Sequence, residues 1–177
     1  KERVEKAQKK NMLEFNLQKD GSYKVRFKGY LKDETGKMRR GKPLTILDGP
    51  YTQEGSKDFQ NILPKEYFPF PKPVKLITQL LDISTNNGID SDDIILDFFS
   101  GSATTAHAVL QSNYQEGRNK KVICVQFPEE TDEKSEVYKA GYKTIADLAK
   151  ERIRRVIKKI ESEKEAEKKE KAGKLDF

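Results

Sequence analysis

Residues 94–110 read IILDFFSGSATTAHAVL and decide the fold class of this chain of 177 residues. The apolar run Ile94–Leu96 is typical of a buried strand, and the turn Ser100–Ser102 leads into a helical stretch from Thr104 to Asn113. A second apolar strand follows at Lys121–Phe127. Strand, turn, helix and strand form a βαβ unit, so the pattern predicts a parallel sheet with a right-handed crossover.

The turn after the first strand lies at the carboxyl edge of the predicted sheet, where open α/β sheets bind ligands. Backbone N–H groups at the helix start favour an anionic group, and Asp97 at the strand end can accept a hydrogen bond from a cationic one. The segment Asp97–Ser102 therefore suits a ligand with both a carboxylate and an ammonium group, such as S-adenosylmethionine. A polar turn without a ligand is the alternative, because the three-glycine dinucleotide fingerprint and the Gly-Lys-Ser/Thr of a phosphate loop are both missing.

Upstream of the βαβ unit, residues alternate between apolar and polar over 13–17 and 23–27, on either side of the turn signal Asp20-Gly21. Gly accepts the positive φ of a tight turn, so the pattern predicts an antiparallel hairpin with one apolar face. Residues 1–11 are expected to form a short charged helix or a frayed end. A further turn is expected at 33–36.

The middle of the chain contains weaker signals and one clear helix. The apolar run 44–47 is consistent with a strand, and residues 48–56 with a loop. From Pro73 to Leu81 the apolar residues share one helical face, and Pro in the first turn of a helix leaves no hydrogen bond unmade. Asn87-Gly88 is expected to close that region.

A long helix is expected near the end of the chain. Its apolar residues form one continuous stripe, which consists of Ile145, Leu148, Ala149, Ile153, Val156, Ile157 and Ile160. We expect this helix to dock on the sheet through Ile145, Leu148, Ile153 and Ile157. Residues 161–174 are almost all Glu, Lys and Ala, which predicts a solvated or fraying extension.

Composition excludes several classes of protein. No stretch approaches the roughly 18 uninterrupted apolar residues of a membrane span, and the start Lys1-Glu2-Arg3 lacks the apolar block of a secretory signal. A single cysteine, Cys124, and a single histidine, His107, exclude a disulfide framework and argue against a Cys/His zinc site. We therefore expect a soluble protein of a reducing compartment with no metal. Because the chain does not begin with Met, we also expect a fragment of a longer protein.

The charges are unevenly distributed. The net charge is +7 over residues 1–40, −5 over 41–149 and +4 over 150–177. Basic ends suit a polyanion such as DNA. Solvated Lys-rich surfaces account for the same pattern without a partner.

Two motifs together indicate a family. Residues 97–109, DFFSGSATTAHAV, resemble motif I of the DNA amino-methyltransferases, with Ala103 where that family usually has Gly. Residues 68–77, FPFPKPVKLI, resemble motif X, and motif X before motif I is the order of the β-class enzymes. The segments 45–60 and 145–153 resemble the modification subunit of type III restriction-modification systems.

The resemblance covers roughly residues 22–160 and implies an α/β fold: part of a Rossmann-like S-adenosylmethionine-dependent methyltransferase sheet, with an N-terminal β-hairpin extension and a long C-terminal helix. It also implies a set of cofactor-binding residues, namely Pro71, Lys72, Pro73, Asp97, Phe98, Phe99, Ser100, Gly101, Ser102, Thr104 and Gln126. Asp97 and the backbone of 100–102 would hold the methionine part of the cofactor, and residues 71–73 would line the same pocket.

Other assignments that follow from the resemblance have alternatives. Gln126, or Glu129 just beyond it, would stand where many methyltransferases place an acidic residue for the ribose hydroxyls. The rings of Phe98, Phe99 and Phe127 would sandwich the adenine or belong to the core. We expect His107 to be satisfied within its helix, and Ala103 to matter only if its position needs a positive φ or very close packing.

No catalytic residue is assigned within the chain. Amino-methyltransferases act through an Asp/Asn-Pro-Pro-Tyr/Phe loop that accepts hydrogen bonds from the exocyclic amine and stacks on the flipped base. The nearest match is Asp48-Gly49-Pro50-Tyr51, but Gly49 replaces the first Pro and the motif lies only a short distance before motif X. We interpret it as an ordinary loop and expect the catalytic loop upstream of Lys1.

Three segments are expected along the chain. Residues 1–42 would contain the hairpin and form a tail of the target-recognition region, 43–160 would be the cofactor-binding part with motifs X, I and II, and 161–177 would be a charged helical or disordered tail.

The leading hypothesis is the cofactor-binding portion of a site-specific DNA adenine N6-methyltransferase of a type III restriction-modification system. Such a protein would be cytoplasmic and would act on double-stranded DNA with a restriction subunit and a second modification subunit. The intact protein would be the enzyme, and this chain alone would be inactive. The alternative is a non-catalytic S-adenosylmethionine- or DNA-binding module from a split or decayed gene. An unrelated Rossmann-like nucleotide enzyme would leave motif X unexplained.

Overall fold

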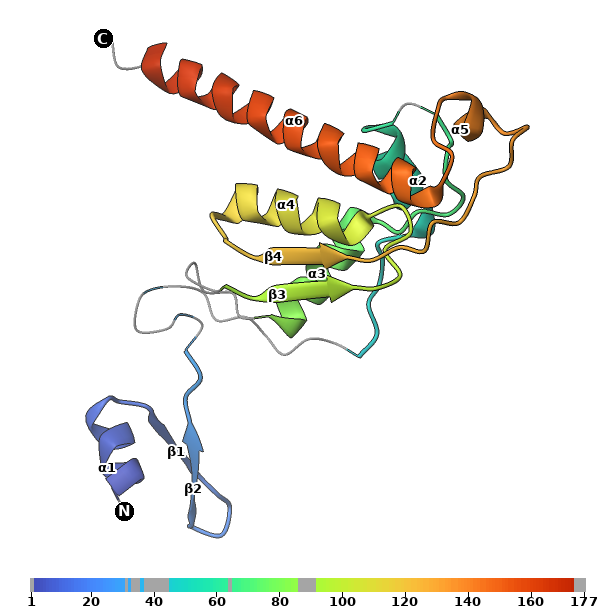
Figure 1. Cartoon of the computed structure of the whole chain (residues 1–177). Helices are drawn as coiled ribbons and strands as arrows, with labels where there is room; N and C mark the ends of the chain where they lie inside the picture. Colours follow the sequence, from blue (N-terminus) through green and yellow to red (C-terminus); the bar gives the residue numbers. More distant parts are fainter. Residues whose placement is uncertain are drawn as a thin grey trace. The chain divides into compact units, whose positions relative to one another are not determined.

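The computed structural model describes residues 2–30, 32, 36, 45–63, 65–85 and 92–173 (Figure 1). The chain divides into two compact units, Lys1–Leu44 and Thr45–Phe177. No helix of the described residues is long and apolar enough to cross a membrane.

The first unit is a helix followed by a hairpin. Helix α1 spans Glu2–Lys9, and strands β1 (Leu13–Leu17) and β2 (Tyr23–Phe27) pair antiparallel. Gly21 takes a φ of 82° in the turn, and the Asp20 carboxylate accepts a hydrogen bond from Ser22 N at 3.0 Å. The hairpin expected from the alternating pattern is confirmed. Its apolar side chains share one face through the register Phe15↔Val25, but most of that face is exposed to solvent.

The second unit is built on a βαβ core. Strand β3 (Ile94–Asp97) pairs in parallel with β4 (Lys121–Cys124), and helix α4 (Thr104–Glu116) connects them. The strand expected over 121–127 ends at Cys124, because only Asp97 and the three residues before it have pairing partners in β4. The βαβ unit predicted from the quoted stretch is confirmed, and the chain as described has a mixed α/β fold with two small sheets.

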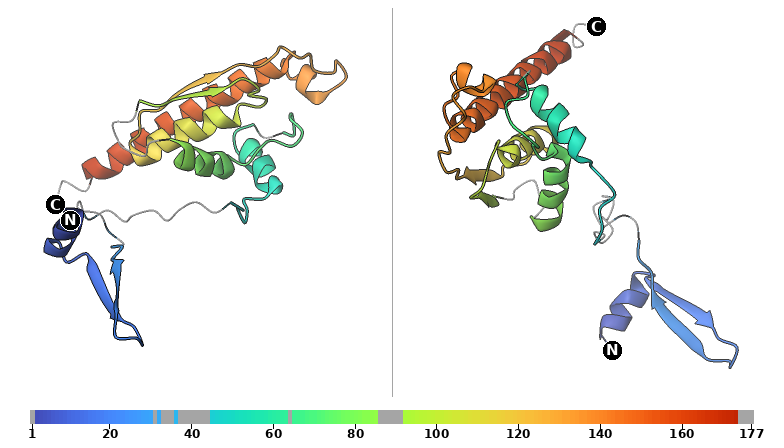
Figure 2. Two further views of the ribbon diagram at one scale, coloured as in Figure 1. Left: turned by 90° about the horizontal axis from the view of Figure 1, so that it is seen from below. Right: turned by 90° about the vertical axis from the view of Figure 1, so that its right-hand side faces the viewer.

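Helices cover one face of the β3–β4 pair. Helix α3 (Val74–Ser84) and helix α4 pack together on that face through Val74, Leu81, Ala108 and Val109, next to Ile95 and Val122 of the strands. The other face, which carries Ile94, Leu96 and Ile123, is not covered by any helix among the described residues of the second unit (Figure 2).

Helix α6 (Ile145–Gly173) docks on α4. Leu148 and Val156 are fully buried in a cluster with Phe59 and Leu63. Ile157, expected among the docking residues, is 40% exposed, so that part of the prediction is wrong. Val156, the neighbouring member of the stripe, is the residue buried at this point.

The expected solvated extension beyond Ile160 is helical as far as Gly173. Its residues are exposed, but it still contacts α4: the Tyr114 hydroxyl donates a hydrogen bond to Glu167 at 2.6 Å, and Lys164 lies 5.6 Å from the centre of the Tyr114 ring.

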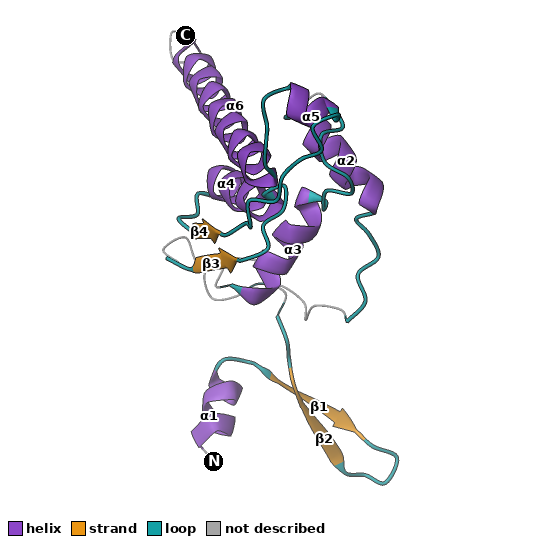
Figure 3. Cartoon of the chain, turned by 45° about the vertical axis from the view of Figure 1, so that its right-hand side comes forward, coloured by secondary structure: helices purple, strands orange, loops and turns teal. Residues whose placement is uncertain are grey.

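Two short helices differ from expectation. Helix α2 (Thr52–Gln60) occupies part of the expected loop 48–56, and α5 (Glu136–Lys139) lies before α6 (Figure 3). Residues 45–47 form no strand. At the start of α2, Tyr51 N donates a hydrogen bond to Glu54 Oε1 at 3.1 Å, which caps the helix. The nearby Gly49 and Gly55 are typical of a loop, so the sequence pattern does not indicate this helix.

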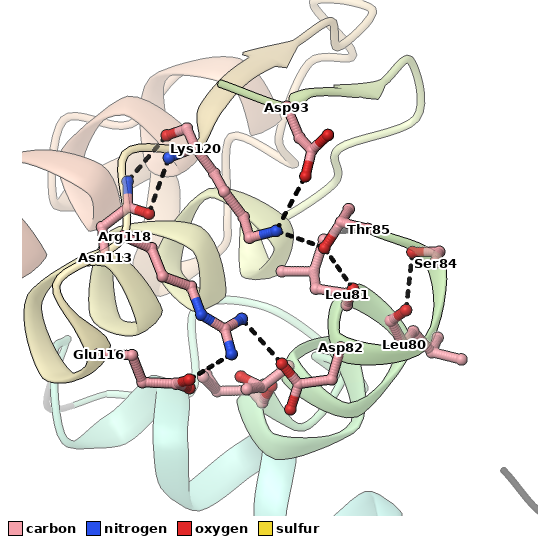
Figure 4. Close-up of polar contacts among 12 residues, drawn as sticks. Leu80, Leu81, Asp82, Ser84, Thr85, Asp93, Asn113, Glu116, Arg118 and Lys120 are labelled. Atoms are coloured by element: carbon pink, nitrogen blue, oxygen red, sulfur yellow. Dashed lines mark hydrogen bonds and ion pairs between the residues drawn. The ribbon is translucent and has the colours of Figure 1, made fainter. Parts of the chain in front are cut away.

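A buried polar cluster fastens the amino ends of the strands to the ends of α3 and α4 (Figure 4). The Lys120 ammonium donates to Asp93 at 3.2 Å and to the Thr85 hydroxyl. The Arg118 guanidinium donates to Asp82 at 2.8 Å and to Glu116. The cluster therefore fixes the edge of the sheet opposite the β3–α4 turn.

Some expectations fall outside the described residues. These are most of the turn at 33–36, Leu44, the Asn87-Gly88 turn and the last four residues of the chain. The three segments expected along the chain stay predictions.

Candidate functional site

The β3–α4 turn, residues 98–103, has the left-handed backbone that makes a loop able to bind an anion. Gly101 has a φ of 49°, and Ala103 has a φ of 59° and is fully buried. Ala103 N donates to Ser100 O at 2.7 Å, which closes the turn. Position 103 thus needs the positive φ for which Gly is the usual residue, and Ala adopts it at some cost in backbone energy. Turns of this kind direct successive N–H groups toward a bound anion.

Asp97 lies at the end of β3, where its half-buried carboxylate organises the turn. One oxygen accepts a hydrogen bond from Phe99 N at 3.2 Å, and the other accepts one from the Thr105 hydroxyl at 2.5 Å. A carboxylate has about four acceptor positions, so both oxygens keep capacity for a ligand.

Gln126, two residues beyond the end of β4, supports the turn. Its side-chain oxygen Oε1 accepts a hydrogen bond from Gly101 N at 2.7 Å, and Ser100 N donates to Val125 O at 3.2 Å. The residue expected at the ribose therefore braces the turn in this structure. Glu129, the other candidate, is exposed.

Motif X lies beside this turn. A Cβ placed on Gly101 would lie 3.5 Å from Cζ of Phe68, so the first residue of motif X is in contact with the turn of motif I. Pro71 and Pro73 are buried and Lys72 is exposed. Although the two motifs are well separated in the sequence, the fold brings them to one place.

Helix α2 holds motif X in this position. The Asp58 carboxylate accepts a hydrogen bond from Val74 N at 2.8 Å, which caps the start of α3. A Cβ on Gly55 would lie 1.9 Å from Pro71 O, so only glycine permits this approach of α2 to the motif X backbone.

The aromatic residues of the turn are exposed. The exposed fractions of Phe98, Phe99 and Phe127 are 61%, 83% and 79%, and the Phe98 and Phe99 ring centres lie 5.0 Å apart. The interpretation of these rings as core is therefore wrong for this chain. Their faces are accessible to a planar group.

Arg152 of α6 lies beneath the turn and was not among the expected site residues. It is fully buried, and its guanidinium donates to Ser102 O at 3.1 Å and to the Thr104 hydroxyl at 2.9 Å. A signal for it exists in the sequence, because an arginine occupies the interior of the apolar stripe between Leu148 and Val156.

His107 is the second buried group at this place. Arg152 Nη2 donates to His107 Nδ1 at 3.2 Å, as expected for a histidine satisfied within the fold. Burial, and next the charge of Arg152, lower the pKa of His107 from 6.5 to about 3. Burial also lowers the pKa of Arg152 to about 10, so the histidine is neutral and the arginine charged at neutral pH.

The Asp48 loop lies in a different groove. That groove has a volume of about 670 Å³ and is lined by residues 47–53 and Leu76, with no residue of motif I among them. The Tyr51 hydroxyl donates to Asp48 Oδ1 at 3.4 Å. Among the residues that the structure describes, no group of three His, Cys, Asp or Glu side chains could hold a metal ion.

Comparison with known proteins decides the family. The model of the DNA methylase family N6_N4_Mtase matches residues 1–172. The chain belongs to this DNA methylase family.

Its curated relatives include modification subunits. The chain is 36% identical over 126 residues to the type III restriction-modification enzyme EcoPI Mod subunit of Escherichia phage P1, and the match covers 70% of the chain and 19% of that subunit. It is 36% identical over 137 residues to the EcoP15I Mod subunit of Escherichia coli, which is 76% of the chain and 20% of the subunit. The type II methyltransferase M.KpnI of Klebsiella pneumoniae is 28% identical over 126 residues, or 29% of its length. The chain thus spans about a fifth of the length of these Mod subunits.

Most of the expected site residues lie in the β3–α4 turn or directly beside it. Asp97 accepts from Phe99 N and Gln126 accepts from Gly101 N, so both are tied to the turn, and Phe68 of motif X lies next to Gly101. Residues 71 and 72 instead lie against Gly55 of α2. Thr104 and Ser102 face the other way, toward Arg152, and are buried. Their side chains therefore support the turn from behind.

Proposed function

We propose that this chain is the cofactor-binding portion of a DNA adenine N6-methyltransferase of a type III restriction-modification system. The observation that carries the proposal is the contact between motif X and motif I at Phe68 and Gly101, because two motifs expected to share a ligand meet where an α/β sheet binds one. Membership of the DNA methylase family and the identity to Mod subunits support it.

The residues at the turn fit S-adenosylmethionine. The positive φ of Gly101 and Ala103 suits a carboxylate, the carboxylate of Asp97 suits an ammonium group, and the exposed rings of Phe98 and Phe99 suit an adenine. Lys72, exposed between the buried prolines 71 and 73, is the cation that motif X contributes to the proposed site. The side-chain oxygen of Gln126 is used by Gly101, and its side-chain nitrogen donates to Phe127 O at 3.2 Å. One of the two hydrogens on that nitrogen therefore remains for the ribose.

The reaction divides into two tasks, of which this chain performs the first. When bound, S-adenosylmethionine supplies an activated methyl group, and the residues of the turn hold it in a fixed orientation. Orienting the exocyclic amine of a flipped adenine is the second task. We assign it to a loop elsewhere in the complete protein, since Asp48 lies in a groove without motif I residues. Double-stranded DNA, a restriction subunit and a second modification subunit are the proposed partners.

Substitution of Asp97 tests the proposal. Asp97→Ala should weaken S-adenosylhomocysteine binding by about tenfold to a hundredfold, because a hydrogen bond to a charged group contributes about 1.5–3 kcal/mol. Isothermal titration calorimetry measures the effect on this chain and on a longer polypeptide that contains it.

Asp48→Ala is the matched control, and its affinity should stay within about twofold of the unchanged chain, below the 1.4 kcal/mol of a tenfold change. Unchanged affinity in a folded Asp97→Ala variant would remove Asp97 from the site. A loss in Asp48→Ala instead would move the ligand to the groove at residues 47–53.

A further inference from the structure

We propose that Arg152 is the positioning residue for the amino-acid part of the cofactor, because it holds the β3–α4 turn in its left-handed shape from behind. This inference rests on the function proposed above. It assigns to α6, a helix that contributes no residue to either motif, a specific role in ligand recognition.

The hydrogen bonds of Arg152 lie on either side of the strained residue. Its Nη1 atom donates to Ser102 O at 3.1 Å and Ser102 Oγ at 3.0 Å, before Ala103, and to Thr104 Oγ1 at 2.9 Å, after it. An alanine with a φ of 59° persists only where its surroundings over-determine it. Arg152 supplies that restraint.

The second nitrogen of the fork ties the turn to the first turn of α4. Nη2 donates to His107 Nδ1 at 3.2 Å, and His107 N donates to Ala103 O at 3.1 Å. Because Arg has no acceptor, Nδ1 must carry the lone pair, and the imidazole is held neutral. One side chain thus fixes residues 102, 104 and 107.

The guanidinium also brings a buried positive charge close to the turn. Among the described residues no carboxylate lies within ion-pair distance of it; the Phe59 ring lies 5.3 Å from Arg152 Cζ, and its Nε atom is buried without a hydrogen-bond partner. The carboxylate of Asp58 acts on it only through its electrostatic field. A buried charge without a neutralising partner favours an anion at the nearest accessible surface. The carboxylate of an amino-acid moiety is the anion that the turn suits.

A comparison of two ligands separates positioning from general stability. S-adenosylhomocysteine carries the amino-acid moiety, and 5′-methylthioadenosine carries the same nucleoside without it. Arg152→Met should weaken the binding of S-adenosylhomocysteine by about tenfold or more and change the affinity for 5′-methylthioadenosine by less than about twofold. Arg152→Lys keeps the charge but loses the forked guanidinium, so its affinity for S-adenosylhomocysteine should lie between those of Arg152→Met and the unchanged chain. Arg154→Met, on the same helix with a side chain 69% exposed, is the control and should match the unchanged chain for both ligands.

Hydrogen exchange of the backbone amides supplies a readout that needs no ligand. Amides of residues 101–107 should exchange faster in Arg152→Met and in Arg152→Lys than in Arg154→Met, while β4 keeps its protection. If Arg152→Met fails to fold, Arg152→Lys carries both measurements.

An equal loss of affinity for the two ligands in a folded Arg152 variant would overturn the role of Arg152. Unchanged hydrogen exchange of the backbone amides at residues 101–107 in that variant would overturn it as well. If the unchanged chain binds neither ligand, the proposed function fails, and the exchange measurement alone decides whether Arg152 holds the turn.

Discussion

His107 shows at the scale of one residue how burial sets chemistry. It is the single histidine of the chain, it lies against the guanidinium of Arg152, and its pKa is lowered from 6.5 to about 3. The folded chain therefore keeps this imidazole neutral at pH values where the unfolded chain protonates it.

The pH dependence of stability follows from this difference. Below pH 6.5 the unfolded chain binds a proton that the folded chain refuses until about pH 3. The contribution of His107 to stability is thus complete above pH 6.5 and falls by about 1.4 kcal/mol per pH unit as the pH drops. At pH 5 the unfolding free energy of the unchanged chain, relative to His107→Gln, should be lower by about 2 kcal/mol than at pH 7.

Urea unfolding at both pH values measures the difference, and NMR observes the imidazole directly. The single imidazole signal should not shift between pH 8 and pH 5. A titration with a midpoint near 6.5 would show that His107 is exposed and that the buried contact with Arg152 does not form.

Individual residues show where sequence reasoning stopped. The strand-end position and the resemblance to motif I predict Asp97 and Gly101 as site residues, and they lie at the end of β3 and in the turn that follows it. The sequence alone does not indicate whether position 103 needs a positive φ, and in the structure the φ of Ala103 is 59°. Arg152 was missed because an arginine within a charge-rich helix reads as solvated, whereas its spacing from Leu148 and Val156 places it on the buried face.

At the scale of elements, strong apolar periodicity predicts strands and helices correctly, whereas glycine residues indicate a loop where the structure has helix α2. The hairpin, the βαβ unit and the helix at 74–84 follow from alternating or helical apolar patterns. Helix α2 was missed because Gly49 and Gly55 suggest a loop. Gly55 is instead the point at which α2 touches the backbone of Pro71, a tertiary reason that no local pattern contains.

Docking of α6 gives a prediction at this scale. Leu148 is fully buried, so Leu148→Ala should lower the free energy of unfolding by about 2–5 kcal/mol. Ile157→Ala removes a similar side chain that is 40% exposed and should cost less than about half as much. Urea denaturation followed by circular dichroism compares the two, and equal losses would contradict the docking of α6 through Leu148.

At the scale of the whole molecule, the described sheet is small for its fold. Parallel sheets are normally covered on both faces, yet Ile94, Leu96 and Ile123 are exposed on one face of β3–β4. The chain spans about a fifth of the length of the Mod subunits that it matches. Periodicity alone could predict the βαβ unit but not that one face of it is open, because both strands are apolar on both faces.

Catalysis should be absent from the chain alone. Because no described group near the turn is suited to orient an adenine amine, we expect no transfer from labelled S-adenosylmethionine to DNA of mixed sequence. A filter-binding assay with the purified chain tests this, and a heat-denatured sample sets the background. Methylation above background that is lost in Asp48→Ala would show that the Asp48–Tyr51 loop is catalytic after all.

The location of the bound cofactor is the central claim, and an NMR chemical-shift titration with S-adenosylhomocysteine tests it most directly, since it detects weak binding and reports its place. We expect the largest shifts at the amides of residues 98–104 and of Phe68, Phe70 and Lys72. No shifts at saturating ligand, or shifts that gather at residues 47–53, would contradict the assignment of the β3–α4 turn as the cofactor site.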